Sequence, residues 1–225
     1  MRKAKTGVKA VRHFFRNVFI ILFVLIVLAL CATTFFFYRG SANYVVKYGT
    51  EITEAAEKEG LSPYLVAGIV KSESDFQADI VAEDGGVGLM QLMPETVDWV
   101  CQRLELDKEM IDLKDPKTNL QIGTHYLSYL ISRYQSEHLA IVAYNTGMTN
   151  VDKWLKDGTI TWALETMQNV PYDVPRRYVH RVDKAQNIYA KMYRGGLPED
   201  TTSENKVLFA FKNMWRTMGA FAAQY

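Results

Sequence analysis

The sequence predicts a mostly α-helical domain that follows one N-terminal transmembrane helix. Residues 18–38 contain no charged side chain and are dense in Phe, Ile, Leu and Val. Between residues 44 and 193, apolar residues recur at three- and four-residue spacing, and a Ser-Pro and an Asp-Pro pair mark helix starts. One glycine-rich turn, at residues 85–88, suits a short extended or hairpin segment. It is the only stretch where we expect β structure.

The N-terminal stretch is basic and then entirely apolar. Residues 1–17 carry six Lys and Arg residues and no acid, and the run 18–38 is long enough to cross a bilayer as a helix. Because basic flanks stay inside, we expect a single-pass protein of the cell membrane with a cytoplasmic N-terminus and an extracytoplasmic domain. A cleaved signal peptide is the alternative, but its apolar region is usually only about 7–15 residues long. We therefore expect an uncleaved anchor, followed by a short tether at residues 39–43.

Charge and cysteine content exclude several function classes. The net charge is +1 and residues 1–17 contribute +6, which leaves −5 for residues 18–225. A mildly acidic outer portion argues against nucleic acid as a partner, since such a partner calls for a basic face. Cys31 lies in the predicted span and Cys101 beyond it, so we expect no disulfide between them. The four histidines are scattered and no phosphate-loop motif appears, so we expect neither a metal nor a cofactor.

Helical patterns then follow one another through residues 44–196, which we expect to form one domain. The first pattern runs from residue 44 to Gly60, a glycine in the usual stop position. Ser62, a capping hydroxyl, and the proline after it start the helix that ends at residue 73. Pro94 occupies the first-turn position of a helix to residue 104. Further apolar patterns cover residues 115–134, 137–145, 151–164 and 176–193.

Residues 197–225 are expected to form a polar linker and a C-terminal amphipathic helix. The stretch 199–205 is polar, and residues 206–225 are apolar again. One interpretation is a last helix packed on the domain. The other is a helix that lies on the membrane surface or meets a partner, because Phe209, Phe211 and Trp215 cover more than one face.

One acidic residue continues an apolar face. Glu73 follows Ile69 by four residues and Val70 by three, so it lies on their side of the helix. Burying a carboxylate costs free energy unless it is paired or protonated, and desolvation raises its pKa, as a general acid near neutral pH requires. The alternative is a glutamate that turns out to solvent at the helix end, or that pairs with Lys71 or an arginine.

A series of motifs extends from this glutamate toward the C-terminus. They are ESDF at 73–76, GLMQLMP at 88–94, DP…N…G…YL within 115–127, AYNTG at 143–147 and VPY…R…YV within 170–179. In this order they resemble the motifs of the soluble-lytic-transglycosylase (SLT, goose-lysozyme-like) family of murein-cleaving enzymes. The resemblance covers roughly residues 44–193 and is far more specific than any single motif.

The resemblance implies a lysozyme-like helical fold and a peptidoglycan lytic transglycosylase that acts on glycan strands. Glu73 would protonate the glycosidic oxygen of the MurNAc-β-1,4-GlcNAc bond. It would then act as base on the muramyl 6-hydroxyl, which attacks C1 and closes a 1,6-anhydro ring. The residues that the resemblance implies for substrate binding are Gln91, Met93, Tyr144, Asn145 and Tyr178.

Two positions depart from the family's pattern. Ala82 replaces a frequent serine and Val174 a frequent glutamate, so the site becomes more apolar. These changes should raise the pKa of Glu73 further, or signal lower activity or altered substrate choice. Two alternatives stay open: a hydrolytic muramidase on the same fold, and a non-catalytic murein-binding scaffold domain. Intact Glu73, Gln91 and Tyr144 favour an enzyme, and the sequence points to no particular protein partner.

Overall fold

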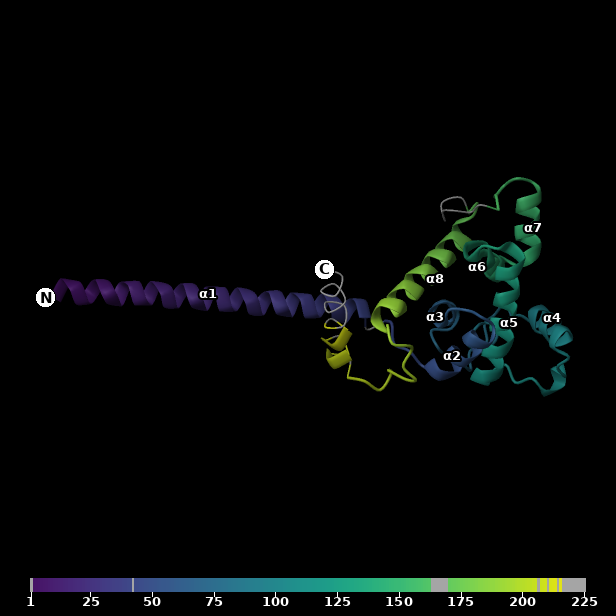
Figure 1. Cartoon of the computed structure of the whole chain (residues 1–225), viewed down its shortest axis with the longest axis horizontal. Helices are drawn as coiled ribbons and strands as arrows, with labels where there is room; N and C mark the ends of the chain where they lie inside the picture. The colour runs from purple at the N-terminus through teal and green to yellow at the C-terminus, as the bar shows by residue number, and fades with distance from the viewer. Residues whose placement is uncertain are drawn as a thin grey trace. The chain divides into compact units, whose positions relative to one another are not determined.

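The computed structural model describes residues 2–41, 43–162, 170–205, 207–209, 211–213 and 215 (Figure 1). It divides into two compact units, a terminal unit of residues 1–43 and 204–225 and a helical domain of residues 44–203. Helices dominate both units, and the predicted mostly α fold class is confirmed. The helices are α1 (Arg2–Ser41), α2 (Gly49–Lys58), α3 (Pro63–Glu73), α4 (Pro94–Leu104), the 3-10 helix η1 (Lys108–Met110), α5 (Pro116–Tyr134), α6 (Glu137–Thr146), α7 (Met148–Lys156) and α8 (Asp173–Met192).

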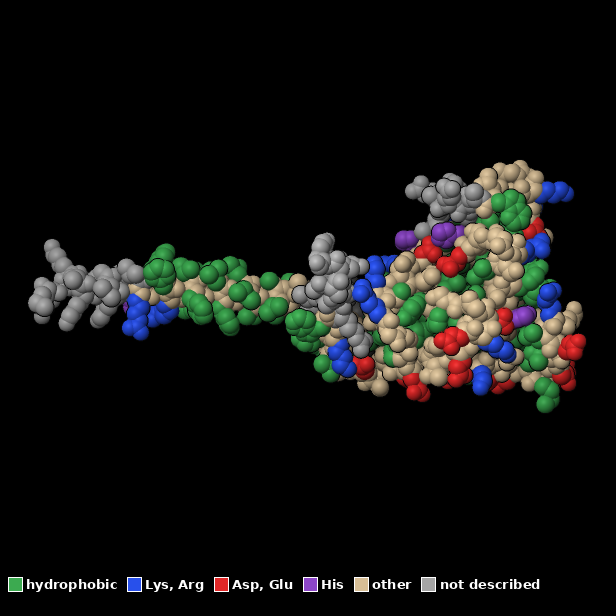
Figure 2. All heavy atoms as spheres, in the orientation of Figure 1, with side chains coloured by type: hydrophobic (Ala, Val, Ile, Leu, Met, Phe, Trp, Pro, Cys, Tyr) green, Lys and Arg blue, Asp and Glu red, His purple; other side chains and the backbone are tan. Residues whose placement is uncertain are grey.

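Helix α1 of the terminal unit contains the predicted apolar segment. Its stretch Arg12–Phe36 is long and apolar enough to cross a membrane, with a mean hydropathy of 3.0. Figure 2 shows apolar side chains along the coloured part of this helix after its basic residues, whereas charged side chains are spread over the helical domain. Helix α1 continues to Ser41, through the first residues of the expected tether.

Helix α3 forms the centre of the helical domain. Its residues Leu65 to Val70 are all buried, as expected for a helix that is covered on every side. Helices α2 and α8 pack on it, and α6 packs on both α5 and α8 (Figure 1). A Cβ atom on Gly68 would lie 3.0 Å from the carbonyl oxygen of Val182, so glycine permits the close approach of α3 to α8.

The predicted helix starts agree with the structure where a proline marks them. Helices α3 and α4 begin at their prolines, and α5 begins at Pro116 after Asp115, whose carboxylate accepts the backbone N–H of Thr118 at 2.8 Å. Ser62 was expected to cap α3, but its hydroxyl makes no capping hydrogen bond. Helix α7 covers the first part of the pattern at 151–164, and residues 163–169 lie outside the described residues.

Helix α2 begins later than expected, at Gly49 instead of residue 44. The preceding residues form what we call the clasp, a pairing of residues 45–49 with residues 198–201. The N–H of Val46 donates to Thr201 Oγ1 at 2.8 Å, and the N–H of Thr201 donates to the Val46 carbonyl at 2.8 Å. The N–H of Gly49 donates to the Glu199 carbonyl at 3.0 Å. These bonds join the two chain ends of the domain.

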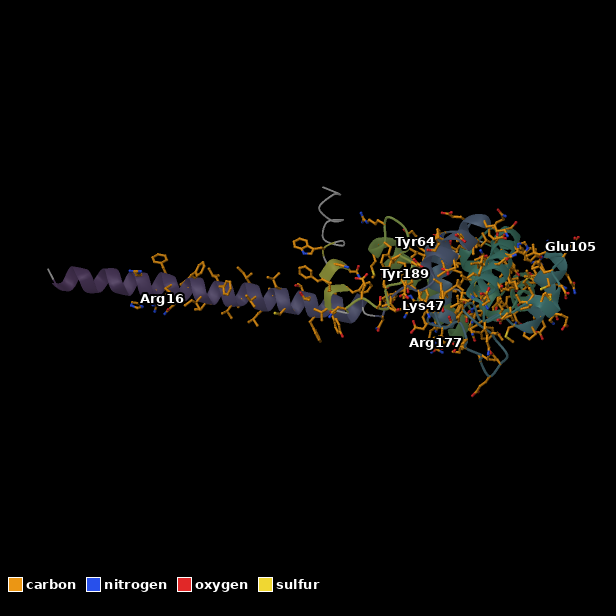
Figure 3. The ribbon with its side chains drawn as sticks, turned by 90° about the horizontal axis from the view of Figure 1, so that it is seen from below. Arg16, Lys47, Tyr64, Glu105, Arg177 and Tyr189 are labelled. Atoms are coloured by element: carbon orange, nitrogen blue, oxygen red, sulfur yellow. The ribbon has the colours of Figure 1, made fainter. Side chains whose placement is uncertain are left out.

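The clasp lies at one end of the helical domain. The hydroxyl of Tyr189 donates to the Val45 carbonyl at 3.2 Å, which ties helix α8 to the same place. Figure 3 shows Lys47 and Tyr189 at this end of the domain and Glu105 at the opposite end. Both chain connections to the terminal unit therefore leave the domain at one end.

Candidate active site

Glu73 is the last residue of α3, and its side chain is largely buried. The hydroxyl of Tyr178, a buried residue of α8, donates a hydrogen bond to Glu73 Oε1 at 2.5 Å. Lys71, which was weighed as a partner of Glu73, forms its ion pair with Asp75 instead. The carboxyl group of Glu73 is therefore held by a neutral hydroxyl donor in a desolvated position.

Burial raises the pKa of Glu73 from 4.5 to about 7. Desolvation is the largest cause, and the negative charge of Asp84 acts in the same direction. The hydrogen bond from Tyr178 and the positive charge of Arg181 lower the pKa and offset part of this rise. The expected direction of the shift is confirmed. A carboxyl group with a pKa near 7 can both donate and accept a proton at neutral pH.

The glycine-rich turn lies beside Glu73 and is fixed by buried polar side chains. Isolated antiparallel bridges pair Val87 with Val81 and with Leu92, in agreement with the predicted extended segment. Gly88 has a φ of 77°, and a Cβ atom there would lie 2.2 Å from the amide nitrogen of Asn119. Only glycine fits this position, because both the backbone angle and the space exclude a side chain.

The side chain of Asn119, from α5, holds this turn in place through hydrogen bonds. Its Oδ1 accepts the N–H of Met90 at 2.9 Å, and its Nδ2 donates to the carbonyls of Val87 at 2.9 Å and Leu113 at 2.8 Å. Ser74 Oγ donates to the Leu89 carbonyl at 2.8 Å from the other side. These contacts fix the turn relative to the end of α3, and so relative to the carboxyl group of Glu73.

The five residues expected to bind substrate differ in their burial and in their hydrogen-bond partners. Tyr144 donates to the Met90 carbonyl at 2.8 Å, so its hydroxyl supports the turn. Gln91 has a φ of 47° and donates to the Gly88 carbonyl at 2.8 Å. Met93 is half-buried at the start of α4, and Asn145 is exposed at the end of α6. Tyr178, expected on the cleft wall, contacts Glu73 directly.

Arg181 is a site residue that the sequence reasoning did not single out. It lies one turn after Tyr178 on α8, and its guanidinium carbon is 5.6 Å from the centre of the Tyr178 ring. Its three-residue spacing from Tyr178 was the available signal, since residues three apart share a helix face. Its charge stabilises the ionised form of Glu73.

An open groove begins at Asn145 and continues toward the start of α8. Its volume is about 490 Å³, within the range of small-ligand sites. Trp154 and Tyr172 pack against each other in it, with ring centroids 5.2 Å apart. Val174, one of the two departures, is exposed and lines this groove, whereas Ala82 lies in the glycine-rich turn, where its N–H donates to the Gly86 carbonyl at 2.8 Å. Within the described residues, no group of three or more His, Cys, Asp or Glu side chains could hold a metal ion.

Comparison with known proteins supports the resemblance. Residues 50–160 match the family model described as the transglycosylase SLT domain. The soluble lytic murein transglycosylase of Escherichia coli (strain K12) is 31% identical over 146 residues, which cover 63% of this chain and 22% of that protein. The membrane-bound lytic murein transglycosylase C of Edwardsiella ictaluri is 26% identical over 171 residues, covering 65% of this chain and 47% of that protein.

A solved structure agrees with these relatives. An inactive mutant of the lytic transglycosylase Slt from Pseudomonas aeruginosa superimposes with a TM-score of 0.59 and 30% identity, over 69% of this chain and 26% of that one. The chain spans less than half the length of each of these proteins. The resemblance predicted from the motifs is thus confirmed, and residues 50–160 match the model of the transglycosylase SLT domain family.

Proposed function

We propose that the chain is a membrane-anchored peptidoglycan lytic transglycosylase that cleaves the MurNAc-β-1,4-GlcNAc bond. One observation carries the proposal. The carboxyl group of Glu73 is desolvated, has a pKa of about 7 and lies beside a rigid glycine-rich turn. The names of the relatives support murein as the substrate.

In this mechanism Glu73 acts first as an acid and then as a base. The protonated carboxyl group gives its proton to the glycosidic oxygen, the bond from that oxygen to C1 breaks, and GlcNAc leaves as an alcohol. The ionised carboxylate then takes the proton of the muramyl 6-hydroxyl as that oxygen attacks C1. The product is a 1,6-anhydro ring, Glu73 is protonated again, and no water is consumed.

Tyr178 and Arg181 assist the middle of this cycle, when Glu73 is ionised. A hydroxyl donor at 2.5 Å and a nearby cation both stabilise the carboxylate more than the neutral acid. They keep the pKa near neutrality in a site whose burial alone would raise it further. Without them, proton transfer to the glycosidic oxygen would leave a less stable carboxylate.

Hydrolysis by a muramidase is the second candidate function, and the charge and exposure of Asp84 favour it. Its charge acts on Glu73, and its side chain is exposed, so it is the carboxylate available to activate a water. The two reactions differ in their products, since hydrolysis leaves a reducing end and the lytic reaction an anhydro end. The products therefore differ by the mass of one water.

Mass spectrometry of muropeptides released from purified murein by the full chain tests the proposal. We expect anhydro ends, loss of all release in Glu73→Gln, and continued release in Asp84→Asn. Glu83→Gln, a change at an exposed neighbour, is the matched control and should keep its activity. Reducing ends would support the muramidase. Murein binding without release by the wild type would support a scaffold domain.

For the anchor, we propose that Arg12–Phe36 of α1 crosses the cell membrane and remains uncleaved. The basic residues at the N-terminal end of α1 favour a cytoplasmic N-terminus and hence an extracytoplasmic helical domain. The full chain should then resist extraction from membranes by alkaline carbonate. Protease added to intact spheroplasts should digest the domain and spare the N-terminus, whereas release of a shortened soluble chain would indicate a cleaved signal.

A further inference from the structure

The C-terminal segment presents apolar side chains that no part of the described terminal unit covers. Its described residues, 207–209, 211–213 and 215, are helical. Leu208, Phe211 and Trp215 are spaced by three and four residues and form one stripe, in which Trp215 is 58% exposed. Phe209 and Asn213 lie four residues apart and are buried. The helix therefore has one buried face and a second, aromatic face that is exposed.

The charge of this segment suits a membrane surface. Residues 206–225 contain two Lys and one Arg and no acidic residue, in contrast to the mildly acidic chain after residue 17. Aromatic and aliphatic residues on one side with scattered cations are the pattern of helices that lie in the interface of anionic bilayers.

Contacts inside the terminal unit place the segment beside the end of α1 that leads to the domain. Val207 lines an apolar groove together with residues of the last third of α1. The α1 residues in that groove are Val27, Leu30, Cys31, Thr34, Phe35 and Tyr38. These residues occupy the end of the candidate span and the turn after it, so the C-terminal helix begins where α1 would leave the bilayer.

Short connections in the chain join the clasp to the end of α1 and to the C-terminal segment. Four residues lie between Ser41, at the end of α1, and Val46, and five lie between Thr201 and Val207. Because an extended chain spans at most about 3.6 Å per residue, Ser41 and Val207 each lie within about 22 Å of the clasp.

We propose that the helical residues 207–209, 211–213 and 215 form a second membrane contact, which lies in the outer interface of the bilayer beside α1 with its Leu208–Phe211–Trp215 stripe among the phospholipid acyl chains. Lys212, the cation of this helix, forms an ion pair with Glu204 at 2.8 Å and is 47% exposed, so it can also meet an anionic headgroup. The chain is then attached to the bilayer at two points, the span of α1 and this helix. The inference rests on the proposed anchor but not on murein cleavage.

Tryptophan fluorescence provides a direct test, because α1 contains no tryptophan. The full chain is reconstituted in vesicles of phosphatidylcholine and phosphatidylglycerol whose acyl chains carry bromine, which quenches nearby indole rings. Of the four tryptophans, only Trp215 lies outside the helical domain. We expect quenching in the wild type, loss of most of it in Trp215→Phe, and no change in Trp162→Phe, an exposed residue of the domain.

Two results would overturn the proposal. One is equal quenching in the wild type and in Trp215→Phe. The other is an unquenched wild type that still resists carbonate extraction, which would mean that α1 is inserted while the C-terminal face meets something other than lipid. Phe211→Ser supplies a second variant that retains Trp215. It should reduce the quenching, because it removes the centre of the stripe.

Discussion

The hydrogen bond between Tyr178 and Glu73 is the contact whose removal has the most definite consequence. Tyr178→Phe deletes the hydroxyl that donates to Glu73 Oε1 at 2.5 Å and leaves the buried ring in place. A hydrogen bond to a charged group contributes about 1.5–3 kcal/mol, and about 1.4 kcal/mol corresponds to one pKa unit. Because this bond favours the ionised form, the pKa of Glu73 should rise from about 7 by a further 1–2 units, roughly.

The pH dependence of murein cleavage reports this change. Bond cleavage requires the protonated acid, so kcat/KM falls as the pH rises through the pKa of Glu73 in the free enzyme. In Tyr178→Phe this basic limb should move to higher pH by the same 1–2 units, roughly, while the maximal rate falls about tenfold because the carboxylate is less stable. Release of soluble muropeptides across a pH series measures both effects.

Tyr144→Phe is the matched control for this experiment. The hydroxyl of Tyr144 donates to the Met90 carbonyl, so its loss loosens the turn without removing a donor from Glu73. Its rate should fall while its basic limb stays near that of the wild type. A basic limb that is unmoved in Tyr178→Phe, or that moves to lower pH, would refute the assignment of the limb to Glu73.

Three further predictions concern stability of the full chain in detergent, measured by chemical denaturation. Glu73→Gln should be more stable than the wild type by about 3 kcal/mol above pH 7 and nearly equal to it below pH 4.5. The folded-state pKa of the acid is raised from 4.5 to about 7, so the wild type loses stability as the pH rises through that window. Asn119→Ala should cost about 3 kcal/mol or more, since three backbone partners lose their hydrogen bonds. Asn150→Ala should be nearly neutral, because Asn150 is exposed and its amide donates to the carbonyl of Thr146 at the end of α6. Thr201→Val should cost about 1–3 kcal/mol because it leaves the buried N–H of Val46 without its acceptor, and an unchanged midpoint would contradict the role of the clasp.

Local sequence signals were sufficient to predict those parts of the fold that depend on residues close together in the chain. Pro63, Pro94 and Pro116 each mark a helix start, because proline favours the first turn. The position of Glu73 on an apolar helix face predicted its burial, and burial raises its pKa. This prediction also needed only the spacing of residues within one helix.

Long-range packing explains what sequence reasoning missed. Whether Tyr144 or Tyr178 donates to Glu73 depends on how α8 lies against α3, and Tyr178 is 105 residues distant from Glu73 in the chain. The late start of α2 likewise depends on residues 198–201, which occupy the backbone groups of the preceding segment. No local pattern encodes either contact.

The close approach of α3 and α8 at Gly68 lets the spacing of these helices influence the pKa of Glu73 from a distance. Gly68 lies five residues before Glu73, and Val182 lies four residues after Tyr178, so the crossing is about one turn from the reacting group. An alanine at position 68 would press on the Val182 carbonyl and separate the helices by a few tenths of an ångström. Evolution could therefore retune the working pH of such a protein by adjusting helix spacing, without altering any group that touches sugar.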